Sequence, residues 1–81
     1  MKDKLKKGYL QWRCRRGTKE LDVVLTQFLD NNYEQLSAAE LMIFDELLST
    51  QDTQLWYWIS GQQQVDSSLF RAIIDKIDVK N

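Results

Sequence analysis

The residues of this chain that are best able to do chemistry lie between Trp12 and Asp22. Three arginines, one lysine and two carboxylates surround Gly17 within ten residues of sequence. That is more charge than the end of a helix requires, and charged side chains are rarely buried without partners. The stretch therefore has the character of an interaction site built on charge.

Other kinds of chemistry lack the residues that they usually need. The chain has no histidine, which is the commonest general base near neutral pH and a frequent metal ligand. The single cysteine, Cys14, can form neither an internal disulfide nor a two-cysteine zinc site, which is typical of a reducing compartment. With 81 residues the chain builds one modest core, and it shows no nucleophile–base pair or phosphate loop. We therefore do not expect an enzyme or a metal site.

The charges are strongly segregated along the chain. Residues 1–19 hold eight basic residues and one aspartate, net +7, whereas residues 20–81 hold eleven carboxylates and three basic residues, net −8. A basic end of this kind can bind nucleic acid, an acidic protein surface or an anionic cofactor. The charge distribution alone does not choose among these ligands.

The first helix is predicted over residues 4–15 and is apolar on two sides. One side carries residues at i, i+4 and i+7, namely Leu5, Tyr9 and Trp12. The opposite side carries Leu10 and Cys14. Such a helix either lies between neighbours or leaves one side for a partner, and the sequence leaves both options open. Arg16 extends the side of Trp12, so we expect its guanidinium to stack over Trp12 at the rim of the core.

The second helix is predicted over residues 19–32. Gly17 is expected to end the first helix in a left-handed conformation, and Thr18 to cap the second. The second helix has a full apolar stripe at helical spacing, made of Leu21, Val24, Leu25, Phe28 and Leu29. Glu20 and Asp22 fall on either side of this stripe, so both should be accessible to solvent. A carboxylate in the first turn also stabilises a helix through its dipole, and spacing alone leaves both interpretations of Glu20 open.

Three further helices complete an all-α chain that we expect to be one helical domain over residues 1–81. Ser37 and Glu40 form a capping box that starts the third helix. Asp52 is predicted to cap a short fourth helix that ends before Gly61, and Asp66 or Ser67 to cap the fifth. The expected buried residues of these helices are Leu41, Phe44, Leu47, Leu48, Leu55, Trp56, Trp58, Ile59, Leu69, Phe70, Ile73, Ile74 and Ile77.

The junction resembles a known family signature. Arg16, Gly17 and Glu20 match the Arg-Gly-x-x-Glu motif of the small flavinylation factors that help to attach FAD covalently to the flavoprotein subunit of succinate dehydrogenase. The match extends to Arg15, Leu21 and Asp22, and the segment 55–58 (Leu-Trp-Tyr-Trp) matches a later Leu-aromatic-x-Trp segment of the family. The resemblance covers most of the chain, and it implies a compact antiparallel five-helix bundle.

The resemblance also implies a function and a site. Members of the family bind the flavoprotein subunit of succinate dehydrogenase, and in bacteria that of fumarate reductase, and promote FAD attachment there. We accordingly expect no stably bound cofactor, with FAD carried by the partner. The expected partner-binding residues are Arg15, Arg16, Gly17, Glu20 and Asp22, where Arg16 offers a planar fork, Gly17 a close backbone approach, and Glu20 and Asp22 a match for basic groups.

Location and an alternative function complete the expectations. No apolar run approaches the roughly 18–20 residues that cross a bilayer, and no apolar signal core follows Lys2 and Lys4, so we expect a cytoplasmic protein without membrane insertion. The family resemblance then implies the bacterial branch. We expect a monomer, although the sequence leaves the oligomeric state open. The alternative is a small helix-turn-helix-like nucleic-acid-binding domain. It is disfavoured because Glu20 and Asp22 open the second helix, where they would repel phosphates.

Overall fold

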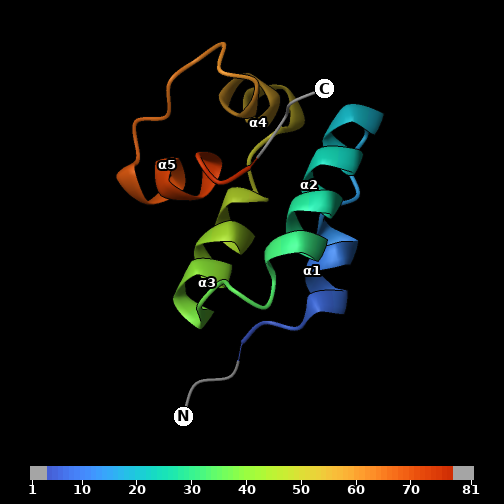
Figure 1. Cartoon of the computed structure of the whole chain (residues 1–81). Helices are drawn as coiled ribbons and strands as arrows, with labels where there is room; N and C mark the ends of the chain where they lie inside the picture. The colour runs from blue at the N-terminus through green and yellow to red at the C-terminus, as the bar shows by residue number, and fades with distance from the viewer. Residues whose placement is uncertain (1–3, 78–81) are drawn as a thin grey trace.

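The structure, a computed structural model, describes residues 4–77. This part of the chain forms five helices joined by short connections (Figure 1). Their bounds are α1 (Lys7–Arg13), α2 (Lys19–Asn32), α3 (Ala38–Leu47), α4 (Asp52–Ile59) and α5 (Ser68–Ile74). No strand occurs in this part of the chain, which confirms the all-α prediction. None of these helices is both long and apolar enough to cross a membrane.

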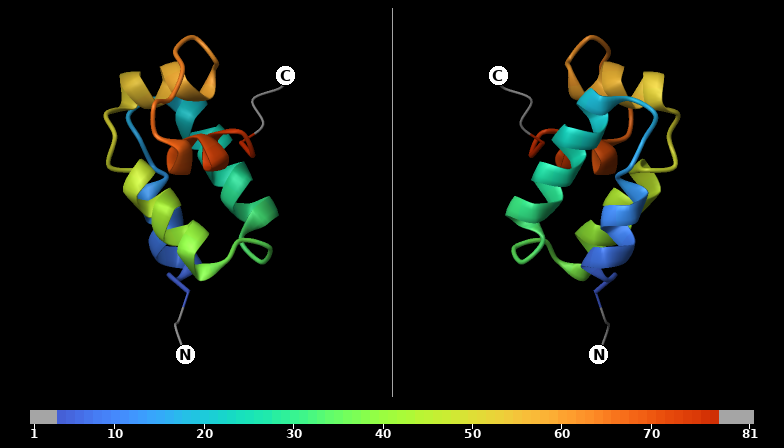
Figure 2. Two further views of the ribbon diagram at one scale, coloured as in Figure 1. Left: turned by 90° about the vertical axis from the view of Figure 1, so that its left-hand side faces the viewer. Right: turned by 90° about the vertical axis from the view of Figure 1, so that its right-hand side faces the viewer.

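The helices pack in two groups around one core. α1 lies against α2, and α3 lies against α5, while α4 and the start of α2 lie at the end of the molecule opposite the start of α1 (Figure 2). α1 and α2 run antiparallel, because Lys7 near the start of α1 pairs with Asp30 near the end of α2. The tilted rings of Phe28 and Phe44, with centroids 5.3 Å apart, join the two groups at the centre.

The sequence signals for α2 and α3 are confirmed. α2 has the predicted bounds, and its stripe is buried except for Val24, which is partly buried. Thr18 is the N-cap residue of α2, although its side chain makes no capping hydrogen bond. Ser37 Oγ accepts from the Glu40 N–H at 3.1 Å, while Glu40 Oε1 accepts from the Ser37 N–H at 2.9 Å. This reciprocal pair is the capping box expected at the start of α3.

Two predictions for the last helices need correction. Asp52 is the first residue of α4 and not its cap, because Gln51 occupies the N-cap position. Ser67 caps α5 by accepting the Phe70 N–H, but Leu69 in the first turn is 59% exposed. α5 turns Ile73 and Ile74 toward the core, and in so short a helix Leu69 falls outside the buried face.

The prediction for α1 is wrong at both ends. Residues 4–6 are not helical, because Lys6 has an extended backbone and Tyr33 Oη donates to the Leu5 carbonyl at 2.8 Å, which holds this segment against the α2–α3 connection. The helix ends at Arg13 with Cys14 as a right-handed cap, so Gly17 is not its left-handed terminator. Among residues 4–77 only Gly61, with φ +84°, has a positive φ.

The structure also decides which side of α1 is buried. Leu10 and Cys14 are fully buried, whereas Trp12 is 68% exposed and Tyr9 is also exposed. Of the two apolar sides that the sequence left open, the side of Tyr9 and Trp12 therefore faces outward. Burial raises the pKa of the Cys14 thiol to about 12, so this sulfur stays protonated and unreactive near neutral pH.

Candidate partner-binding site

Arg16 lies on the inner side of the junction between α1 and α2. Its Nε donates to Asp52 Oδ1 at 2.8 Å, its Nη1 to the Leu48 carbonyl at 2.6 Å, and its Nη2 to the Thr50 carbonyl at 2.7 Å. The side chain is only 12% exposed. Since each nitrogen of the guanidinium has a partner within the chain, Arg16 joins the junction to the connection between α3 and α4.

This arrangement corrects two expectations for Arg16. Its guanidinium does not stack over Trp12 but points to the opposite side, toward the backbone carbonyls that follow α3. The last carbonyls of a helix have no intrahelical donors, so a planar cation with several donors suits them. Because these donors are already used, Arg16 cannot offer a free fork to a partner without breaking them.

Asp52 is the acidic partner of the junction. Its Oδ1 accepts from Arg16 and its Oδ2 accepts from the Gly17 N–H at 3.0 Å. The Arg16 side chain, followed by the Gly17 N–H, holds the pKa of the Asp52 carboxyl below its ordinary value. One carboxylate at the start of α4 therefore fixes both a side chain and the backbone of the junction.

Gly17 has a role in this contact that does not depend on a left-handed backbone. A Cβ built at Gly17 would lie 3.4 Å from Asp52 Oδ2, the oxygen that accepts the Gly17 N–H. This is an ordinary van der Waals contact with the end of a side chain, so the space around Gly17 does not by itself require glycine. Gly17 itself is exposed, so its other side is open to a partner.

Asp22 also holds the junction from α2. Its Oδ1 accepts the backbone N–H of Arg16, and its side chain is partly buried. Asp22 thus fixes the turn that precedes its own helix, much as a capping residue does. Asp22 was expected to be accessible to solvent, but it is partly buried, and one of its carboxylate oxygens is occupied by the Arg16 N–H.

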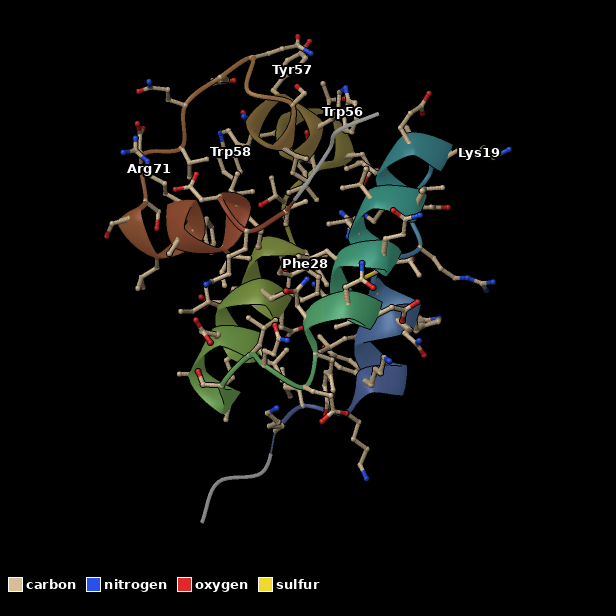
Figure 3. All side chains as sticks on the ribbon, in the orientation of Figure 1. Lys19, Phe28, Trp56, Tyr57, Trp58 and Arg71 are labelled. Carbon is tan, nitrogen blue, oxygen red and sulfur yellow. The ribbon has the colours of Figure 1, made fainter. Side chains whose placement is uncertain are left out.

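Arg15 and Glu20 face outward. Both are exposed, and neither forms an ion pair within the described part of the chain. Glu20 lines a small pocket of about 160 Å³ together with Thr18, Asp52, Thr53 and Trp56. Figure 3 shows Trp56 at the end of the molecule where α4 approaches the start of α2, with Lys19 pointing away from α4.

The structure therefore brings all five predicted residues to one junction but divides them into two sets. Arg16 and Asp22 hold the junction from inside, whereas Arg15, Gly17 and Glu20 are exposed. Sequence reasoning missed Asp52, which was interpreted as a helix cap, and Trp56, which was assigned to the core. For Asp52 no local signal exists, because an acidic residue at a helix start is common for other reasons.

The chemistry that this site supports is recognition. Within residues 4–77, no group of histidine, cysteine or acidic side chains is placed to hold a metal ion. Cys14 lies beneath the junction and its pKa is raised by burial. The exposed side chains of Arg15 and Glu20 carry opposite charges, and Glu20 and Asp52 line the small pocket, so the site suits hydrogen bonding to another protein.

Comparison with known proteins places this junction in a family context. A family model described as flavinator of succinate dehydrogenase matches residues 9–81, which include the whole junction. The chain belongs to this family. No solved structure gives a significant match.

Curated relatives of the chain carry a consistent name. The FAD assembly factor SdhE of Aliivibrio fischeri is 39% identical over 71 residues, which cover 88% of this chain and 83% of the relative. The FAD assembly factor SdhE of Coxiella burnetii is 38% identical over 77 residues, which cover 95% of this chain and 94% of the relative. In both comparisons the similarity thus extends over most of this chain and most of the relative.

Proposed function

We propose that this chain binds the flavoprotein subunit of succinate dehydrogenase and promotes the covalent attachment of FAD to it. Its membership of the flavinator family and the relatives named FAD assembly factor support this function over the nucleic-acid-binding alternative. The flavoprotein subunit of fumarate reductase is proposed as a second partner. The chain is proposed to act in the cytoplasm as a monomer.

The observation that carries the proposal is that some residues of the junction hold it in place while others are exposed. Arg16 and Asp52 fix the backbone between α1 and α2, and this leaves Arg15, Gly17 and Glu20 exposed on a rigid support. Groups that are held in place before binding lose less conformational entropy when a partner docks. The motif is therefore well suited to recognise one conformation of a protein.

A binding protein can promote flavin attachment without contributing a catalytic side chain. Cofactors supply much of the chemistry of their own reactions, and the protein supplies orientation and electrostatics. A helper that binds the reactive conformation of the flavoprotein more tightly than other conformations raises the population of that conformation. In this proposal FAD stays with the flavoprotein and this chain holds no cofactor stably.

The test compares flavin attachment with and without the chain. A bacterial strain that lacks its own FAD assembly factor is made to express the flavoprotein subunit alone or together with this chain. Covalent flavin is measured as fluorescence of the denatured flavoprotein at matched protein levels. We expect the chain to restore covalent flavin and to co-purify with the flavoprotein. Equal amounts of covalent flavin with and without the chain would contradict the proposal.

A further inference from the structure

The outer face of α1 carries the most exposed large apolar side chain among residues 4–77. Trp12 is 68% exposed, whereas Trp56 and Trp58 are partly buried against the core. The position one turn earlier in α1 is Gly8, and a Cβ placed there would meet nothing within 4 Å. Because Gly8 has no side chain, the residue one turn earlier does not cover the Trp12 indole.

The exposure of Trp12 follows from how α1 is fixed. Leu10 and Cys14 are fully buried, and Arg13 donates to the Asp45 carbonyl of α3 at 3.1 Å. These contacts set the rotation of α1 and leave Trp12 outward. A tryptophan buries about 150–250 Å² when it is covered, and tryptophan and arginine are the residues that most often dominate the energy of protein interfaces.

The charges around Trp12 favour an acidic partner. Residues 4–19 contain no acidic residue. Lys7, Arg13 and Arg16 are paired with aspartates of other helices, but Arg15 is exposed and forms no ion pair within the described part of the chain. The backbone N–H of Arg15 donates to the Trp12 carbonyl at 3.2 Å, so both residues belong to the turn that ends α1.

The neighbouring part of α2 extends this surface. Arg15 lines a shallow pocket of about 390 Å³ with Asp22, Val23, Thr26 and Gln27. Val23 is 45% exposed, so the pocket has an apolar wall next to Arg15. Asp22 lines the same pocket, but one of its carboxylate oxygens accepts the Arg16 N–H, and Arg15 and Asp22 form no ion pair. We use the name Trp12 surface for Trp12, for Arg15 in the same turn, and for Val23, which lines the pocket of Arg15.

We propose that the Trp12 surface docks onto an apolar patch bordered by carboxylates on the flavoprotein partner. This inference rests on the proposed function and adds a second contact region to the Gly17–Glu20 side of the junction. The exposed side chain of Met42 lacks the same setting. Met42 of α3 lies in a groove with Asp45 and Glu46, whose charges would repel an acidic partner.

The test measures binding of purified chain variants to the purified flavoprotein subunit. We expect Trp12→Ala to weaken the affinity about tenfold or more, in line with an aromatic hot spot, and Trp12→Phe to weaken it less. Met42→Ala and Leu69→Ala are matched controls, since they truncate apolar side chains that are 58% and 59% exposed on other helices. We expect both controls to bind like the unmodified chain, and thermal unfolding of all four variants to stay close to it.

Several results would overturn the inference. Unchanged affinity of Trp12→Ala would remove the surface from the interface, and a large loss of thermal stability would make Trp12 a packing residue. Dimers of the unmodified chain in sedimentation that disappear with Trp12→Ala would assign the surface to self-association. A blue shift of tryptophan fluorescence on phosphatidylglycerol vesicles, lost in Trp12→Ala, would assign it to membranes. If the unmodified chain does not bind the flavoprotein, the proposed function itself fails, which is a separate result.

Discussion

The inner and outer sides of the α1–α2 junction use neighbouring arginines in opposite ways. On the inner side, Arg16 is 12% exposed and its guanidinium nitrogens donate to Asp52 and to backbone carbonyls after α3. On the outer side, Arg15 is exposed and without an ion pair in residues 4–77. Two adjacent residues of one type thus differ entirely in what they contact.

The difference shows how a small helical chain can keep a charged loop in one conformation. The apolar core holds the helices, but the junction between Cys14 and Lys19 has few apolar side chains to bury. Arg16 and Asp52 supply the missing contacts through charge-assisted hydrogen bonds, which are stronger than neutral ones. The outer residues are then free to act on a partner, and mutations can separate the two sides.

The largest expected effect on stability comes from the inner side. Arg16→Ala removes the donors to Asp52, Leu48 and Thr50. A hydrogen bond to a charged group has a net contribution of about 1.5–3 kcal/mol, and the bonds of one side chain are not additive. We expect the free energy of unfolding in urea to fall by about 2–3 kcal/mol. Arg71→Ala, which removes an exposed arginine with one bond to the Val65 carbonyl, is the control and should cost less than about 0.5 kcal/mol.

Equal free energies of unfolding for Arg16→Ala and Arg71→Ala would contradict the special role of Arg16 in holding the junction. Arg16→Lys refines the test, because lysine keeps the charge but cannot reproduce the planar fork. We expect Arg16→Lys to lie between the alanine variant and the unmodified chain. A lysine variant as stable as the unmodified chain would mean that charge alone, and not the directed bonds, holds the junction.

A smaller effect is expected for Asp52→Asn, and it should depend on pH. Because Arg16 and the Gly17 N–H lower the pKa of Asp52, its carboxylate stabilises the fold fully above its unfolded pKa of about 4 and progressively less as the pH falls through the folded value. We expect Asp52→Asn to cost about 1 kcal/mol at pH 7, and the difference to shrink below about pH 4.

Urea unfolding at a series of pH values measures this difference. Glu40, whose pKa is lowered by the Ser37 N–H, titrates in both proteins and cancels in the comparison. Asp66→Asn, at an exposed position, is the matched control and should change stability little at any pH. A constant difference between Asp52→Asn and the unmodified chain from pH 7 to pH 3 would contradict the account of this carboxylate.

Local signals in the sequence predicted most of the fold. The stripe of α2 and the capping box of Ser37 and Glu40 are confirmed because each depends only on residues within about one or two turns of the same helix. α1 was predicted too long, since its ends are set by distant partners. Tyr33 holds the segment before it, and Asp22 and Asp52 hold the segment after it.

The sequence predicted which residues lie at the candidate site, but not which of them turn inward and which face solvent. The charges and the motif located the junction at Arg15, Arg16, Gly17, Glu20 and Asp22. Which arginine turns inward depends on Asp52, which lies 36 residues after Arg16 and has no pattern that links it to the junction. The outward side of α1 was likewise left open, because both of its apolar sides satisfied helical periodicity.

The most direct test of the account is Glu20→Ala. Glu20 is exposed in the first turn of α2, so its loss should cost only a few tenths of a kcal/mol through the helix dipole. Covalent flavin fluorescence of the denatured flavoprotein is measured after co-expression with Glu20→Ala or with Glu46→Ala, an exposed glutamate of α3, at matched soluble levels. We predict that Glu20→Ala lowers covalent flavin to near the level without the chain, while Glu46→Ala restores it fully. Full flavin attachment with Glu20→Ala would show that the outer side of the junction is not the partner-binding site.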